Sequence, residues 1–268
     1  MHLVFTGDCS ISTFRKSPNV RLPMNNTGCN TATGTAWAVL VAFFLIPLAC
    51  AQTVRPVIME YTAKVAKGSV ELVNPGVIPL TVIMEPKSFT VDENGNISYR
   101  PLYKSIHVKM SATSFQIPPQ QSHFVFYEAS ADTLPAWFVL YADIGGYHKT
   151  DQGLNIRLDL PHTVYILPKK SVAKSDLTVK QLDLSPDKTK LRFEVANTGQ
   201  LFGRVLISQL SGKNDAQGSG FPVFPNSKRI VEVPCKGDQT NVSLRLHLKN
   251  FTVEQPLDNS SGVPSCAP

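Results

Sequence analysis

Histidine, aspartate and glutamate are the first residues to inspect for chemistry, because they supply most general acids and bases and many metal ligands. The six histidines are scattered, and no two stand at a metal-site spacing: His2, His107, His123, His148, His162 and His247. Asp143 and Asp151 lie in loop-like sequence without an evident partner. The sequence contains no G-x-S-x-G, H-E-x-x-H or P-loop motif. We therefore expect a protein that is not an enzyme and that uses no metal or cofactor.

A segment with alternating apolar residues suggests protein binding instead. Leu154, Ile156 and Leu158 alternate with polar residues, so in an extended strand they share one face. The segment follows a polar loop, Gly145–Gly153, and closes the first of two strand-rich parts of the chain. A strand in last position often lies at a sheet edge, where its free N–H and C=O groups can pair with an incoming strand. The alternative is a strand that is fully paired inside its sheet.

Short strand patterns dominate the sequence beyond residue 52, and no stretch shows capped helical periodicity over three turns. The run Ala136–Ala142 is continuously apolar, as expected for a strand buried on both faces, and we place Trp137 in a core. Asn94-Gly95 is a strong hairpin signal. Closely spaced short strands predict a β-sandwich. The charged fraction of 17% is low, which is common in sheet proteins.

The strand pattern divides the chain into two all-β units. Pro168 and a lysine-rich stretch interrupt the pattern, so we expect a linker at 169–174 between a domain at 52–168 and a smaller domain at 175–250. Within the second unit, 212–220 is predicted as turn or loop, and 251–268 as a polar tail. The two units share a short repeated pattern, Asn-x-Gly at the end of a predicted strand: Asn74-Pro-Gly76 and Asn197-Thr-Gly199.

Residues 1–51 have the pattern of a signal peptide or leader. The apolar, uncharged run at 36–48 is too short for a membrane-spanning helix, which needs about 20 residues, and basic residues precede it. Ala49-Cys50-Ala51 predicts cleavage before Gln52. A start at Met24, a lipid on Cys50 and an uncleaved anchor remain as alternatives. Under each of these alternatives the protein is still expected to be exported.

The cysteines that follow the leader indicate one disulfide. Cleavage before Gln52 leaves only Cys235 and Cys266, and an even pair in an exported chain favours a bridge over two free thiols. No Cys/His spacing points to zinc. The net charge of +6 is spread along the chain without a block of like charges, so we expect no nucleic-acid partner. No small-molecule substrate is evident either.

In the order and spacing of its segments, the chain resembles the PapD-like periplasmic pilus-assembly chaperones of the chaperone/usher pathway. Leu154–Leu158 followed by Val164–Pro168 resembles their donor strand and the proline that ends it. Ser69–Asn74 resembles their second strand with its terminal Asn. Phe115–Ser122 and Ala136–Ala142 resemble the segments that precede the donor strand. The resemblance covers residues 54 to 168 and is weaker up to about 250.

This resemblance implies a fold and a function. The fold would be all-β, with two immunoglobulin-like β-sandwich domains after the signal peptide. The function would be that of a periplasmic chaperone for exported, pilus-like subunits, with an outer-membrane usher as a further partner. Leu154, Ile156 and Leu158 would complete the subunit's fold by donor-strand complementation. The alternative is a structural or cell-surface immunoglobulin-like binding module without chaperone activity.

One part of the family pattern is missing. The family anchors a subunit's terminal carboxylate with an Arg and a Lys, but alignment on Pro168 puts Thr163 at the Lys position. The Arg position falls near Ile58 or Met59, and Arg55 is the nearest arginine. Threonine cannot supply a charge-assisted hydrogen bond to a carboxylate. Arg55, Arg157 and Thr163 are therefore only candidate anchors, and we expect a divergent member that holds its client differently.

Overall fold

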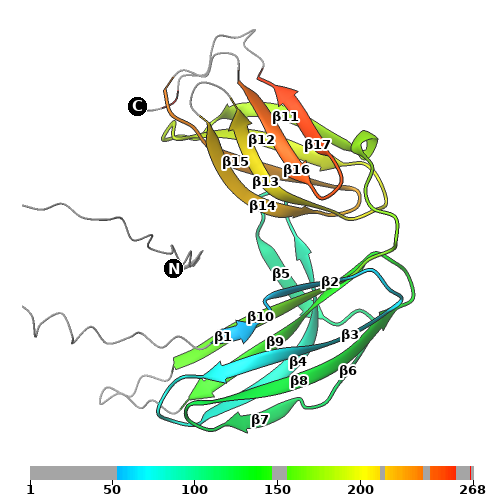
Figure 1. Cartoon of the computed structure of the whole chain (residues 1–268), viewed down its shortest axis with the longest axis vertical. Coiled ribbons are helices and arrows are strands. Elements are labelled where there is room, and N and C mark those ends of the chain that lie inside the picture. Colours follow the sequence, from blue (N-terminus) through cyan, green and yellow to red (C-terminus); the bar gives the residue numbers. More distant parts are fainter. Residues whose placement is uncertain (1–52, 147–155, 212–214, 238–241, 258–265, 267–268) are drawn as a thin grey trace, which may run out of the picture. The chain divides into compact units, whose positions relative to one another are not determined.

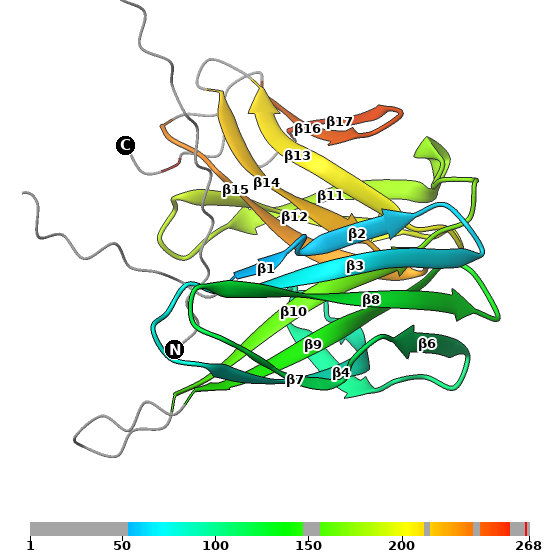
Figure 2. The same cartoon turned by 60° about the horizontal axis from the view of Figure 1, so that its bottom comes forward.

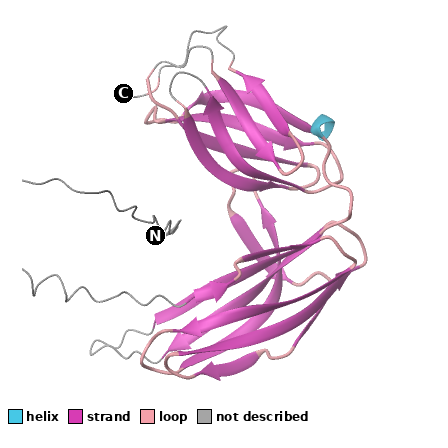
Figure 3. Ribbon diagram, in the orientation of Figure 1, coloured by secondary structure: helices cyan, strands magenta, loops and turns pink. Residues whose placement is uncertain are grey.

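The computed structural model describes residues 53–146, 156–211, 215–237, 242–257 and 266. Leu154, Cys50 and the predicted leader lie outside these residues, as does the side chain of Ile156. The described residues belong to one compact unit. Strands account for nearly all of its regular structure, and a single short 3-10 turn, η2 (Lys174–Asp176), interrupts them in the described part (Figure 3).

The first sandwich consists of two sheets, which Figures 1 and 2 show from two sides. One sheet has the order β1 (Thr53–Arg55), β3 (Val65–Asn74), β8 (Gln121–Ala131) and β6 (Ile106–Met110). The other has the order β2 (Ile58–Tyr61), β10 (Ile156–Ile166), β9 (Ala136–Gly146), β4 (Leu80–Val91) and β5 (Ile97–Pro101), and β7 (Ser114–Ile117) pairs with β4. The N-terminal segment thus changes sheets: β1 pairs with β3, whereas β2 runs parallel to β10.

The core of the first sandwich follows from the alternation of side chains along its strands. Phe138 and Leu140 of β9 are fully buried between the sheets, together with Leu72 of β3. On the opposite face of β9, Val139 is also buried, in a separate cluster with Phe89. Trp137 and Tyr141 on this outer face are half-buried and pack against the same cluster, so the prediction of burial on both faces is confirmed fully only at Val139.

The second sandwich is built in the same way. Its sheets have the orders β11 (Leu177–Leu184), β12 (Lys190–Asn197), β15 (Ser227–Pro234), and β14 (Ala216–Val223), β13 (Gly203–Ser211), β16 (Ser243–Leu248), β17 (Thr252–Pro256). Phe193, Leu210 and Leu244 lie in its core. The Cys235–Cys266 disulfide, with a Cα–Cα distance of 5.9 Å, adds both of its cysteines to that core. The prediction of an all-β fold with two immunoglobulin-like sandwiches is confirmed.

The second sandwich differs from expectation at two places. The segment 212–220, predicted as loop, contains most of β14, because Gly218 and Gly220 let this strand approach its neighbours closely. A Cβ at Gly220 would lie 2.4 Å from the carbonyl oxygen of Leu206, which belongs to the adjacent β13. The segment 251–268, predicted as a polar tail, contains β17, which pairs with β16, and the buried Leu257.

The Asn-x-Gly pattern shared by the two units is a repeated polar turn. Asn74 is fully buried, donates from Nδ2 to the carbonyl groups of Ile78, Ile117 and Pro118, and accepts from the Gly76 N–H. Asn197 donates to Leu201 and accepts from the Gly199 N–H, again two positions ahead. Each Asn thus holds the turn after its own strand, and Asn74 also joins that turn to the segment at Ile117 and Pro118.

Candidate functional site

The most distinctive feature of the first sandwich is a partly unpaired strand, β10. On one side β10 pairs with β9 along its whole length, Ile156–Ile166. On the other side β2 pairs only with Thr163–Ile166 (Figure 1). Among the described residues, no strand pairs with positions 156–162 on that side. We call this stretch the free edge.

The backbone alternation shows which groups the free edge presents. The Thr163 N–H donates to the Val57 carbonyl at 2.8 Å, so odd-numbered residues of β10 direct their backbone groups away from β9. Arg157, Asp159 and Pro161 share this direction, since strands alternate with a period of two residues. Proline has no N–H and is tolerated in strands where that group would point to solvent. The free edge therefore offers carbonyl groups at all three residues and N–H groups at Arg157 and Asp159.

The inner face of the free edge is apolar. Leu158 and Leu160 are half-buried and pack against the first core, at the end of the sandwich that β2 does not reach. Leu158 was predicted for this role; Leu160 was missed, although it continues the same two-residue alternation in the sequence. An incoming strand would meet both unpaired backbone groups and incompletely buried leucine side chains here.

A buried polar chain lies where the free edge ends and pairing with β2 begins. His162 is fully buried; its Nδ1 donates to the Pro56 carbonyl, and its Nε2 lies 3.0 Å from the Tyr127 hydroxyl. The Tyr61 hydroxyl is 2.9 Å from that of Tyr127. Gly68 makes room for the tyrosines, because a Cβ there would lie 2.0 Å from the Tyr61 hydroxyl oxygen. These hydrogen-bonded side chains connect β10, β8 and β2 with the turn that leads from β1 into β2.

Burial decides the protonation of this polar chain. It lowers the pKa of His162, because desolvation disfavours the imidazolium, although the hydrogen bond to Pro56 acts in the opposite direction. Burial also raises the pKa of Tyr127 strongly, and the hydrogen bond with Tyr61 adds to this effect. Both groups are uncharged at neutral pH. We therefore interpret this buried row of hydrogen bonds as stabilising the place where β2 begins to pair with β10.

Charged and aromatic residues cover the outer face beside the free edge. Arg157 binds Asp143 of β9 through two hydrogen bonds, with Nε 2.6 Å from Oδ1. Its Nε is 3.8 Å from the Asp159 carboxylate. Tyr141 hydrogen-bonds to Asp159 and packs against Tyr99, with 5.1 Å between ring centroids.

The candidate anchor residues do not come together. Arg55 is exposed on β1, opposite Glu71 of β3, in the sheet that does not contain β10. Arg157 is held by Asp143, and Thr163 is half-buried on β10 opposite Ile58. The two positions suggested by alignment on Pro168 are thus neighbours, but neither carries a cation. Anchoring by any of the three residues stays a prediction. The buried polar side chain at this place is His162, which sequence reasoning did not single out.

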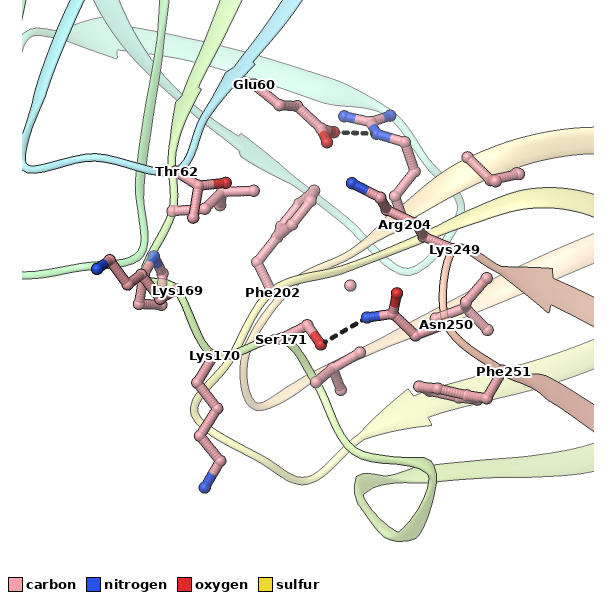
Figure 4. Close-up of a pocket in the computed structure, with 16 residues that line it drawn as sticks. Glu60, Thr62, Lys169, Lys170, Ser171, Phe202, Arg204, Lys249, Asn250 and Phe251 are labelled. Atoms are coloured by element: carbon pink, nitrogen blue, oxygen red, sulfur yellow. Dashed lines mark hydrogen bonds and ion pairs between the residues drawn. The ribbon is translucent and has the colours of Figure 1, made fainter.

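A pocket of about 260 Å³ lies beside the segment that connects the two sandwiches (Figure 4). Arg204 of β13 and Glu60 of β2 point toward each other at its margin and form an ion pair. The guanidinium also lies over the Tyr165 ring, 4.9 Å from its centroid, which leaves Nη2 buried without a partner among the described residues. The lining combines lysines and apolar side chains with Ser171 and Asn250, whose side chains are 3.2 Å apart.

The described ranges contain no cluster of metal-binding side chains and no helix long and apolar enough to cross a membrane. No protein-family model and no curated protein sequence matches the chain. Comparison with solved structures does find similar proteins.

One similar structure is the YadV chaperone, with a TM-score of 0.48, 13% identity, and coverage of 77% of this chain and 99% of that one. Another is the Salmonella enterica SafA pilin in complex with the SafB chaperone, with a TM-score of 0.48, 12% identity, and coverage of 77% and 96%. A third is the CsuC–CsuE chaperone–tip subunit complex from the archaic chaperone–usher Csu pili of Acinetobacter baumannii, with a TM-score of 0.44, 14% identity, and coverage of 76% and 98%. The chain is thus similar to chaperones of pilus assembly, at low sequence identity.

Proposed function

We propose that this protein is a periplasmic, non-enzymatic chaperone that binds exported β-rich subunits by pairing one of their strands with the free edge of β10. Pilus-like subunits are the expected class of client, and an outer-membrane usher is the expected further partner. The observation that carries the proposal is the unpaired side of β10 at 156–162, together with the half-buried Leu158 and Leu160.

The free edge has the two features that strand addition requires. Backbone groups of Arg157, Asp159 and Pro161 are available for main-chain hydrogen bonds, which give such interfaces their affinity. Leu158 and Leu160 supply apolar contacts with a spacing of two residues, which gives specificity. Each leucine would gain burial on binding, and complete burial of such a side chain is worth about 1.5–3 kcal/mol.

The first test removes the apolar contact. The chain is co-expressed with candidate exported pilus subunits, and the amount of co-purified subunit is measured. We expect Leu158→Asp to reduce capture strongly, because it places a charge in the apolar contact. Phe126→Asp is the matched control: Phe126 is 61% exposed on β8, in the other sheet, so this variant should retain capture.

The second test removes a backbone donor. Arg157→Pro and Arg157→Ala both remove the ion pair with Asp143, but only the proline removes an N–H that points away from β9. We expect Arg157→Pro to capture less subunit than Arg157→Ala while both remain folded. If both tests leave capture unchanged, strand pairing at the free edge is wrong, and the alternative of a structural or cell-surface binding module gains support.

A further inference from the structure

The outer face of the free edge holds an incompletely neutralised carboxylate. Asp159 of β10 stands directly opposite Asp143 of β9 in the strand register. Like charges directly opposite each other destabilise a strand pair. Arg157 serves both carboxylates but lies closer to Asp143, with Nε at 2.6 Å, than to Asp159, at 3.8 Å. Among the described residues, Arg157 is the only cation between the two carboxylates, and its interaction with Asp159 is the weaker of the two.

The other charged neighbours do not correct this imbalance. Lys87 of β4 lies 4.6 Å from the centroid of the Tyr141 ring, but its Nζ pairs with Glu85 at 3.1 Å. The outer face next to the edge thus holds the carboxylates of Asp143, Asp159 and Glu85 against the cations Arg157 and Lys87. One negative charge is in excess.

Aromatic side chains line the same place. Burial, the hydrogen bond to Asp159 and the charge of that carboxylate raise the pKa of Tyr141 to about 12, so its hydroxyl keeps its proton and donates to Asp159. Burial and the Asp159 charge also raise the pKa of Tyr99. Asp159 therefore stands at an exposed strand edge beside two neutral phenol rings, and its own side chain is 46% exposed.

We infer that the strand which pairs with the free edge carries a Lys or Arg on its outer face, opposite Asp159. This inference rests on the proposed function. Residues opposite each other on neighbouring strands have Cβ atoms about 4.5–5.5 Å apart, within reach of an ion pair. A cation at that place meets the excess negative charge and the faces of Tyr99 or Tyr141, which attract cations. An acidic residue there would add another carboxylate to the group.

The test uses short labelled peptides in which Val alternates with Thr, and in which the central Thr is replaced by Lys, Gln or Glu. Because such a peptide can shift along the edge by two residues, its central residue can reach Asp159 in either strand direction. Binding to the full chain is measured by fluorescence anisotropy at low salt. We expect the Lys peptide to bind about two- to fivefold more tightly than the Gln peptide, and the Glu peptide to bind most weakly, as cross-strand charge pairs allow.

Variants of the chain identify the residue responsible. Asp159→Asn should make the three peptides bind alike, and Asp159→Lys should reverse their order. Asp132→Asn is the matched control, because Asp132 is an exposed carboxylate, paired with His107, that lies away from β10 and should not change the order. High salt should reduce the difference between the peptides in the unchanged chain.

The possible results separate the two proposals. If all three peptides bind the unchanged chain equally, the inference about Asp159 is wrong, whereas strand pairing at the free edge stands. The same conclusion follows if Asp159→Asn preserves the order of affinities. If none of the peptides binds, strand pairing at the free edge itself is contradicted, and the inference falls with it.

Discussion

Mild acid should destabilise the first sandwich through His162. Burial lowers the pKa of this histidine below its ordinary value of 6.5, so the unfolded chain takes up the proton first as the pH falls. Because the unfolded state then binds more protons, the free energy of unfolding decreases from about pH 6.5 downward. One histidine contributes at most about 1.4 kcal/mol per pH unit. The loss ends at the lower, folded-state pKa.

Replacement of His162 by Leu should remove this pH dependence and leave a constant cost. The Pro56 carbonyl would lose its partner, whereas Tyr127 would keep its contact with Tyr61. A polar group left without its hydrogen bond costs about 1–3 kcal/mol. The variant should therefore be less stable by about this amount at pH 7.5, and the difference from the original chain should shrink toward pH 5.

Urea unfolding at several pH values measures both effects. The fluorescence of Trp137, in a Trp37→Phe background, follows the first sandwich, because Trp137 lies on β9 with its indole N–H donating to the Phe89 carbonyl at 3.1 Å. His107→Leu is the control, since the side chain of His107 is 60% exposed. Equal pH slopes for His162→Leu and the original chain would refute this account of the buried polar chain.

Three further predictions concern the stability of the two sandwiches. Replacing Cys235 and Cys266 by Ser should destabilise the second sandwich by about 3–4 kcal/mol, the loop-entropy value for their sequence separation of 31, as measured by denaturant unfolding. Gly220→Ala should cost about 1–3 kcal/mol, because the new methyl group meets backbone atoms, whereas Gly145→Ala meets nothing within 4 Å and should be neutral in the same measurement. Asn74→Ala should lower the melting temperature of the first sandwich, because three carbonyl groups lose a donor; an unchanged melting temperature would contradict the role given to the Asn turn.

The sequence was informative wherever one strand's own pattern decides the outcome. The alternation around Leu158 predicted its face correctly, and the apolar run around Val139 predicted burial on both sides. Pro161, within an alternating run, was an unused signal for an edge strand. β14 was missed because its glycines are typical of loops, and only the close approach of β13 makes them fit a strand.

Other features depend on residues that are far apart in the sequence. His162 contacts Pro56 and Tyr127, which lie 106 and 35 positions away, so no local pattern reveals the polar chain. The length of the free edge depends on where β2 stops pairing with β10, and β2 is too short to be read from its own sequence. The opposition of Asp143 and Asp159 likewise requires the strand register.

Pro161 also has a consequence for the protein at high concentration. Suppose that two copies approached with their free edges antiparallel and overlapping as fully as possible. Each Asp159 would then face its counterpart. Each Pro161 would face an Arg157 of the other copy, and the proline has no backbone N–H to donate to it. Like charges and missing donors both weaken such a dimer. Asp159 and Pro161 therefore disfavour edge-to-edge dimers of this protein, although both lie on the edge that is available to a strand from another protein.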